Sequence, residues 1–138
     1  MPAFSQQSMA RLKTCHPQLQ LVALEVVRTY DCTVLEGHRG EELQSKYREE
    51  GKSRISWPNG PHNMTPSNAV HLVPYPFPGW QKLKYFYFFS GYVLATGVGM
   101  GIVLRWGGDW DMDGELNDQI FNDLPHFEIS EIKEDNNV

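Results

Sequence analysis

The sequence predicts an α+β fold, and three observations support this class. Segments with helical spacing of apolar residues and short segments rich in β-branched residues both occur, and they segregate loosely along the chain. The length of 138 residues fits one domain with a core of its own. Apolar residues make up 41% of the chain and charged residues 21%, a balance that favours folding over disorder. We therefore expect a single domain over 1–138 that ends in a disordered tail over 130–138.

Local patterns predict the elements in chain order. Ser5 is placed to cap a first helix, and Pro17 suits the first turn of a second helix. β-branched and apolar residues mark the short strands, while the Gly, Pro, Ser and Asn of 51–66 and the acidic stretch 107–122 predict loops. The expected helices are 5–13, 16–31, 41–50 and 80–95. The expected strands are 32–36, 69–73, 101–106 and 126–129.

One uncharged stretch, Tyr85 to Leu104, is long enough to cross a bilayer. It contains hydroxyl side chains and four glycines, however, and it lacks a continuous block of Leu, Ile and Val. We therefore interpret it as a buried helix followed by a buried strand, with Gly97, Gly99 and Gly101 breaking the helix between them. No membrane insertion is expected.

Charge and cysteine content narrow the classes of partner. The net charge of -5 argues against nucleic acid or an anionic membrane as the main partner. Cys15 and Cys32 are too few for a disulfide framework and adjoin apolar segments, so we expect buried thiols. Residues 1–14 contain no apolar run, and no signal peptide is predicted there.

Three histidines together indicate a catalytic metal site. His62 falls in a predicted loop, His71 in a strand and His126 at the start of another strand, so the three can converge on one point. Three protein ligands leave a fourth position on zinc for water, as hydrolytic zinc sites require. A single histidine is more often an ordinary surface or core residue, so the hypothesis rests on the combination.

Two further residues are candidates for catalysis. Asp123 is a candidate general base if the chain from it to His126 curves around the ion, and the alternative is an Asp that caps a turn before Pro125. Arg39 follows the first strand, where it could stabilise an oxyanion or form a surface salt bridge. Glu128 shares a strand face with His126 and is either a partner of that ligand or a solvated carboxylate.

A second metal hypothesis concerns the acidic loop. Asp109, Asp111 and Asp113 alternate before Gly114, as in the first half of a calcium-binding EF-hand loop. The twelfth position is Ile120 instead of Glu, so the match is incomplete. The sequence leaves both a calcium site and a solvated acidic turn open.

Short segments spread along the chain carry a family resemblance. They are Thr14-Cys15-His16-Pro17, Asp31-Cys32-Thr33-Val34, Glu36-Gly37-His38-Arg39-Gly40, Gly51-Lys52-Ser53, His62-Asn63, Pro66-Ser67, Ala69-Val70, Pro74-Tyr75-Pro76, Arg105-Trp106-Gly107-Gly108-Asp109-Trp110 and Asp123-Leu124-Pro125-His126-Phe127-Glu128. In this order they resemble the zinc peptidases of peptidoglycan, a family that includes phage L-alanyl-D-glutamate endopeptidases and D-alanyl-D-alanine carboxypeptidases. The resemblance covers about Ser8 to Ile129, nearly the whole chain.

The resemblance implies a small antiparallel sheet with flanking helices and a zinc site at the sheet. It makes His62 and His126 zinc ligands, and it makes Asp123 the catalytic base. Arg39 would steady the substrate carbonyl as it becomes an oxyanion.

Two positions depart from the family pattern. The middle ligand is normally Asp, and here that place is His71, which can also bind zinc. Loss of a negative ligand adds a unit of positive charge, which should make bound water more acidic and metal binding weaker. Gly60 stands where a Ser usually precedes the first ligand by two residues, so a supporting hydroxyl is absent.

The leading functional prediction is an endolysin-like zinc metallopeptidase that hydrolyses the L-alanyl-D-glutamate bond of the peptidoglycan stem. One alternative is a D-Ala-D-Ala carboxypeptidase, and another is a zinc-binding but inactive cell-wall-binding or virion protein, which His71 keeps open. We expect a monomer. Because no export signal is predicted, we also expect the protein to stay in the cytoplasm of an infected bacterium until another protein releases it to the wall. The peptide stem is the expected partner, with zinc as the metal and calcium as a second candidate.

Overall fold

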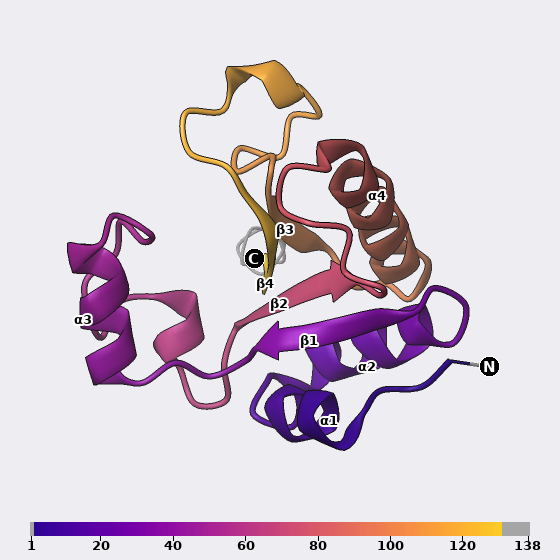
Figure 1. The fold of residues 1–138 in the computed structure, drawn as a ribbon, viewed down its shortest axis with the longest axis horizontal. Coiled ribbons are helices and arrows are strands. Elements are labelled where there is room, and N and C mark those ends of the chain that lie inside the picture. The colour runs from indigo at the N-terminus through magenta and orange to yellow at the C-terminus, as the bar shows by residue number, and fades with distance from the viewer. Residues whose placement is uncertain (1, 131–138) are drawn as a thin grey trace, which may run out of the picture.

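A computed structural model describes residues 2–130 of the chain. Within these residues four strands form one antiparallel sheet in the order β1-β2-β4-β3, flanked by helices (Figure 1), which confirms the predicted α+β class. The strands are β1 Cys32–Glu36, β2 Ala69–Pro74, β3 Leu104–Gly107 and β4 Asp123–Ile129. The helices are α1 Gln6–Leu12, α2 Pro17–Val27, α3 Glu41–Glu49 and α4 Leu83–Gly99, with short 3-10 helices η1 Pro61–Asn63 and η2 Leu116–Asp118.

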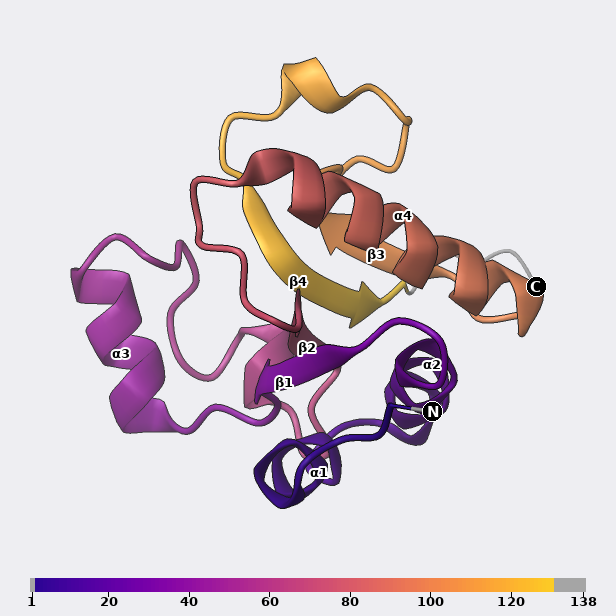
Figure 2. The same cartoon turned by 45° about the vertical axis from the view of Figure 1, so that its right-hand side comes forward.

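Helices α2 and α4 bury one face of the sheet. Figure 2 shows α4 running across β3 and β4, with α2 beside the other end of the sheet and α3 standing apart. Side chains alternate between the two faces of a strand, so Val70, Leu72 and Phe127 enter the core under these helices. The remaining core side chains come mainly from α1, α2, α4 and β3: Leu12, Leu19, Val22, Val26, Phe89, Val93, Leu104 and Trp106.

The outer edge of β1 is covered by α1. The hydroxyl of Ser8 accepts a hydrogen bond from the Val34 amide at 3.1 Å, and the Arg11 guanidinium donates to the Val34 carbonyl at 3.0 Å. An edge strand presents unpaired backbone groups, and here both groups of its central residue find partners. These contacts cover the edge of the sheet at β1. Because α2 and α4 cover one face of the sheet, the functional side chains lie on the opposite face.

Several predicted boundaries differ from the structure. Helix α2 ends at Val27, four residues before the predicted end, with Arg28 as its C-cap. Strand β4 begins at Asp123 instead of His126, and β3 is displaced to Leu104–Gly107. The loop predicted over 51–66 contains the single turn η1. Helix α4 starts three residues later and ends four residues later than the predicted helix over 80–95, and the remaining helices and strands lie within about one residue of the predicted positions.

The predicted helix break at Gly97 and Gly99 is wrong. Helix α4 starts at Leu83 and continues through Gly97 to Gly99, and Gly101, with φ of +76°, follows its end. A side chain at Gly97 would meet the carbonyl oxygen of Ile102, with a Cβ to oxygen distance of 2.7 Å. The glycine therefore allows the chain after α4 to fold back closely against the helix, and it does not end the helix.

Helix α4 is also less buried than predicted. It packs Phe89 and Val93 into the core, but Phe88 on its outer side is 72% exposed. Among the described residues, no helix is both long enough and apolar enough to traverse a membrane.

Both cysteines are buried free thiols, as predicted. Burial raises the pKa of Cys15 to about 11 and that of Cys32 to about 12, which makes both thiols unreactive at neutral pH. The predicted disordered tail over 130–138 lies outside the described residues except for Ser130, which is buried and whose amide donates to the Val103 carbonyl. The prediction is therefore wrong at Ser130.

Candidate metal centre

The three predicted ligand histidines meet on the sheet face opposite the core helices. His71 in β2 and His126 in β4 are direct partners in the strand register, and η1 brings His62 over them. The ring centroids are 4.6 Å apart for His62 and His71, 5.1 Å for His62 and His126, and 5.3 Å for His71 and His126. The predicted convergence of a turn and two strands therefore exists in the structure.

One nitrogen of each ring points into a common space. The ligand atoms that the three rings offer all lie within 4.8 Å of one another. His62 Nε2 is buried and has no hydrogen-bond partner among the described residues. A buried unpaired nitrogen is costly, because burial removes its hydrogen bond to water. A metal ion that accepts its lone pair would remove that cost, so the residues present fit a metal.

The outer nitrogen of each ring faces an acceptor. The Gly37 carbonyl lies 2.7 Å from His62 Nδ1, and a Glu128 oxygen lies 2.7 Å from His126 Nε2. Because carbonyl and carboxylate oxygens only accept, these outer nitrogens carry the protons and the inner nitrogens present lone pairs. At the third ring, a Glu36 oxygen lies 3.8 Å from His71 Nδ1. Glu128 is thus a buried partner of His126 and not a solvated carboxylate.

Strand register explains how these acceptors reach the rings. Glu36 in β1 pairs with His71, and His71 pairs with His126, so the three side chains form one row across the sheet. Glu128 stands two residues along β4 from His126 and therefore on the same face. The sequence supplied Glu128 as a candidate partner, but Glu36 was missed because its pairing with His71 requires the register of two strands that are far apart in sequence.

Asp123 lies beside the histidines because β4 is bulged. Trp106 of β3 pairs with Phe127, but the next residue, Gly107, pairs with Asp123, so β4 advances four residues while β3 advances one. This bulge brings an Asp123 oxygen to 3.4 Å from His71 Nε2 and 3.7 Å from His126 Nδ1. The structure therefore places Asp123 beside the histidines. The general-base hypothesis requires this position, whereas the alternative of a turn-capping Asp does not.

Arg39 is a buried residue of the same site and not a surface ion pair. Two of its nitrogens donate to the Glu36 carboxylate, and a third donates to Gln44 Oε1 at 2.9 Å. The Asn63 amide donates to both the Arg39 carbonyl and Gln44 Oε1. A side chain at Gly60 would meet Asn63 Oδ1 at 2.8 Å, so this network occupies the space of the missing serine side chain.

The electrostatic environment lowers the pKa values of His62, His126 and Asp123, which favours neutral His62 and His126 and an ionised Asp123. Burial, followed by the charges of His71, His126 and Arg39, lowers the pKa of His62 well below its ordinary range. Burial also lowers the pKa of His126, against the opposing hydrogen bond of Glu128. Burial alone would raise the pKa of Asp123, but its hydrogen bond with His71 and nearby positive charge lower it overall. Neutral imidazoles and a charged carboxylate are the forms that bind a metal and accept a proton.

The three aspartates of the acidic loop also lie together. Oxygens of Asp109, Asp111 and Asp113 approach within 4.8 Å of one another. Asp109 Oδ2 accepts a hydrogen bond from the Gly114 amide, and Ile120 is 89% exposed and offers no oxygen from its side chain. Calcium binding by this loop stays a prediction.

A cleft of about 970 Å³ opens over the histidines. His62, His71, His126, Asp123 and Arg39 all contribute to its lining. Loop 107–122 borders the cleft and places the Trp110 ring 5.1 Å from the His126 ring. The three histidines therefore lie in the lining of a cleft that is large enough to admit a substrate.

Comparisons with known proteins give consistent matches over this chain. The model of a family described as phage L-alanyl-D-glutamate peptidase matches residues 2–130. The L-alanyl-D-glutamate peptidase of Escherichia phage T5 is 30% identical over 122 residues, which cover 85% of this chain and 88% of that protein. The crystal structure of the L-Ala D-Glu endopeptidase ChiX of Serratia marcescens has the same fold, with a TM-score of 0.74 and 22% identity over 96% of this chain and 94% of that one.

Proposed function

The chain belongs to the phage L-alanyl-D-glutamate peptidase family, and from this premise we propose that it hydrolyses the L-alanyl-D-glutamate bond of the peptidoglycan stem with zinc held by His62, His71 and His126. The observation that carries the proposal is the convergence of three imidazole nitrogens and the Asp123 carboxylate at the base of one cleft. A zinc ion held by these three histidines would supply the positive charge that polarises a scissile carbonyl and acidifies a water molecule, which is the chemistry that amide hydrolysis needs.

Asp123 is proposed to move the proton. Its carboxylate is ionised and 26% exposed, so it can contact a water molecule in the cleft. As the water oxygen bonds to the scissile carbonyl carbon, Asp123 accepts the proton. The carbon–nitrogen bond then breaks, and Asp123 donates that proton to the amine of the leaving D-glutamate.

Arg39 is proposed to stabilise the charge that develops on the carbonyl oxygen. A fixed positive charge in a partly dehydrated cleft stabilises an oxyanion more strongly than the same charge in water. Its hydrogen bonds to Glu36 and Gln44 hold the guanidinium in place before substrate arrives, so little reorganisation is needed.

His71 is proposed to be an adopted ligand and not a defect. Its Nε2 lies 3.3 Å from His126 Nδ1, among the inner nitrogens, although the family resemblance predicts Asp at this position. The neighbouring Glu36 carboxylate lies beside the outer nitrogen of His71. It therefore supplies a negative charge behind the ligand, where the family's Asp would supply one on the ligand itself. This arrangement favours an active enzyme over the inactive wall-binding alternative.

The proposal is tested by mass spectrometry of purified peptidoglycan after incubation with zinc-loaded protein. We expect new L-alanine carboxyl termini and new D-glutamate amino termini. The Asp123→Asn variant keeps the three histidines and should lose about 10²- to 10⁴-fold in rate, the range for loss of a general base. The exposed Glu42→Gln variant on α3 is the matched carboxylate-to-amide control and should cleave normally.

Two outcomes would redirect the assignment. Release of free D-alanine without new D-glutamate amino termini would place the protein among the carboxypeptidases. Intact peptidoglycan after incubation with protein that holds one zinc ion would favour the inactive wall-binding alternative.

A further inference from the structure

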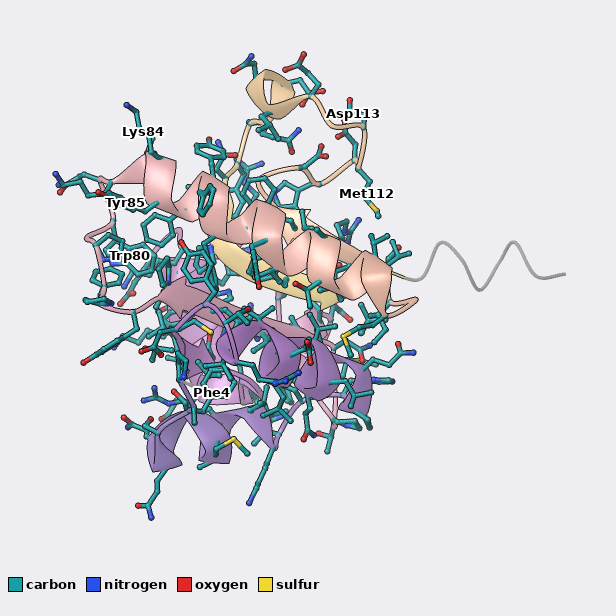
Figure 3. The ribbon with its side chains drawn as sticks, turned by 90° about the vertical axis from the view of Figure 1, so that its right-hand side faces the viewer. Phe4, Trp80, Lys84, Tyr85, Met112 and Asp113 are labelled. Atoms are coloured by element: carbon teal, nitrogen blue, oxygen red, sulfur yellow. The ribbon has the colours of Figure 1, made fainter. Side chains whose placement is uncertain are left out.

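Three aromatic side chains lie exposed in the segment that leads from β2 into α4. Tyr75 is 59% exposed, Phe77 47% and Trp80 53%, and we refer to these three as the aromatic platform. Figure 3 shows Trp80 with Lys84 and Tyr85 at the end of the molecule where α4 begins. Apolar surface of this size is costly to leave in water, and clustered aromatics of this kind mark binding surfaces.

The platform is rigid because its central ring is packed from below. The Trp80 ring stacks on Phe86 with centroids 5.4 Å apart and an interplanar angle of 11°, and Phe86 is buried. Phe77 packs edge-on against Trp80 at 5.0 Å. One face of the indole is therefore occupied, and its exposed half is held in a fixed orientation with little rotamer entropy left to lose.

The platform meets the catalytic cleft at Trp80. Trp80, Leu83 and Phe86 line the cleft together with His71 and Asp123. Segment 75–81 carries no charged residue, whereas the lining that follows α3 contributes Lys52 and Arg54. The cleft lining therefore includes uncharged aromatic residues and, from a different segment of the chain, the cations Lys52 and Arg54, which we call the basic region.

The proposed substrate has the same division. In peptidoglycan the amino group of the stem L-alanine is joined through a lactyl group to N-acetylmuramic acid, so an uncharged sugar stands next to the scissile residue. An extended residue spans at most about 3.6 Å, and the sugar begins within about two residue lengths of the scissile carbonyl. The residues beyond the scissile bond carry free carboxylates, which suit the basic region.

We propose that the aromatic platform binds the glycan strand of peptidoglycan, with a sugar ring stacked on the exposed face of Trp80. This inference rests on the proposed function, because it requires the L-alanine carbonyl to lie at the histidines. The apolar faces of sugar rings cover aromatic rings, while the sugar hydroxyl groups stay in water. The platform thereby selects stems that are still attached to glycan.

The test compares hydrolysis of two soluble substrates that share the scissile bond. One is a disaccharide tripeptide from peptidoglycan, and the other is the N-acetylated tripeptide without sugar. For the wild type we expect kcat/KM to be about tenfold higher with the sugar, equivalent to one well-formed contact and expressed mainly in KM. Trp80→Ala should bring the ratio close to one, and Trp80→Tyr should keep most of it.

Phe88→Ala is the matched control. Phe88 is an aromatic residue of α4 that is more exposed than Trp80 but does not line the cleft, so its loss should leave the ratio unchanged. Phe77→Ala gives a second variant of the platform in case Trp80→Ala folds poorly. An equal rate on both substrates in the wild type, with no effect of Trp80→Ala, would overturn the glycan assignment.

A binding measurement separates this proposal from the proposed function. Calorimetric titration of metal-free protein with peptide-free glycan oligosaccharide should show binding that Trp80→Ala weakens about tenfold. This result would support the platform even if the protein cleaved neither substrate. Conversion of a wild-type dimer into a monomer by Trp80→Ala, seen in sedimentation, would instead identify a subunit interface and overturn the proposal.

Discussion

His71 stands between two acidic side chains in a row that crosses three strands. Glu36 faces its outer nitrogen from β1, and Asp123 faces its inner nitrogen from β4. The family resemblance predicts a carboxylate at this position, and imidazole brings no negative charge. Glu36 can compensate because a carboxylate next to the outer nitrogen raises the basicity of the inner one.

We predict that Glu36→Gln weakens zinc binding about 10- to 100-fold, the usual cost of losing an acceptor behind a ligand histidine. In a His71→Asp background the same change should strengthen binding or leave it unchanged, because two adjacent carboxylates repel each other. Competition with a chromophoric chelator measures all four affinities.

The double-mutant cycle also contains its own control. Glu36 holds Arg39 as well as His71, and the loss of the Arg39 contact is common to both backgrounds. Equal weakening in both backgrounds would mean that Glu36 acts only through Arg39, and the compensation argument would then fail.

At the residue scale, the sequence identified most of the groups that meet at the site. His62, His71, His126, Asp123 and Arg39 were all candidates, and all five line the cleft. The sequence could not show which nitrogens point inward, because that depends on acceptors supplied by other segments. Gly37 offers only its backbone carbonyl, which leaves no trace in a side-chain pattern.

At the element scale, two glycines of α4 have opposite roles. Gly91 faces open space, with no atom within 4 Å of an added Cβ, whereas Gly97 packs against the Ile102 carbonyl. The predicted helix over 80–95 contains Gly91, and its break is predicted at the closely spaced Gly97, Gly99 and Gly101, but the helix continues to Gly99. Close approach of a distant backbone, not a turn, accounts for Gly97.

We predict opposite effects of Ala at these two positions on the free energy of unfolding. Gly91→Ala should raise it by about 0.8–1.0 kcal/mol, because Ala is the better helix former. Gly97→Ala should lower it by about 1–3 kcal/mol, because the added methyl group overpacks the contact with Ile102. Urea denaturation measures both, and stabilisation by Gly97→Ala would show that the contact yields easily.

The bulge in β4 could not be predicted from the sequence, because it also depends on contact with a segment that is distant along the chain. The predicted strand began at His126, whereas the observed strand begins three residues earlier, at Asp123. The additional residues that carry Asp123 to the histidines depend on pairing with β3, where Gly107 leaves room for the Asp123 backbone. The proximity of Asp123 to the metal position thus arises between two strands and in neither alone.

At the scale of the whole molecule, the buried histidines link folding to pH. The pKa values of His62 and His126 are lowered in the folded protein, whereas in the unfolded chain histidine titrates at about 6.5. Below that pH the histidines of the unfolded chain bind protons, whereas His62 and His126 of the folded chain stay unprotonated. The free energy of unfolding therefore falls as pH falls. Asp123 and Glu128, whose pKa values are also lowered, add to the loss only near pH of about 4 and below.

We predict that the melting temperature of metal-free protein falls between about pH 7.5 and pH 5.5, a range set by the ordinary histidine pKa. The variant His62→Asn should have a shallower dependence, because one buried proton-binding group is gone. His38→Asn, which removes an exposed histidine, should keep the wild-type slope. Scanning calorimetry of chelated samples across this range gives the slopes, and a flat profile for the wild type would contradict the burial argument.

The most direct test of the account is a zinc titration of chelated protein, with L-alanyl-D-glutamate cleavage as the readout. If His62, His71 and His126 form one metal centre that drives hydrolysis, cleavage should be absent at the start and complete at one zinc ion per chain. Full cleavage by metal-free protein, or no cleavage after zinc has saturated the site, would contradict it.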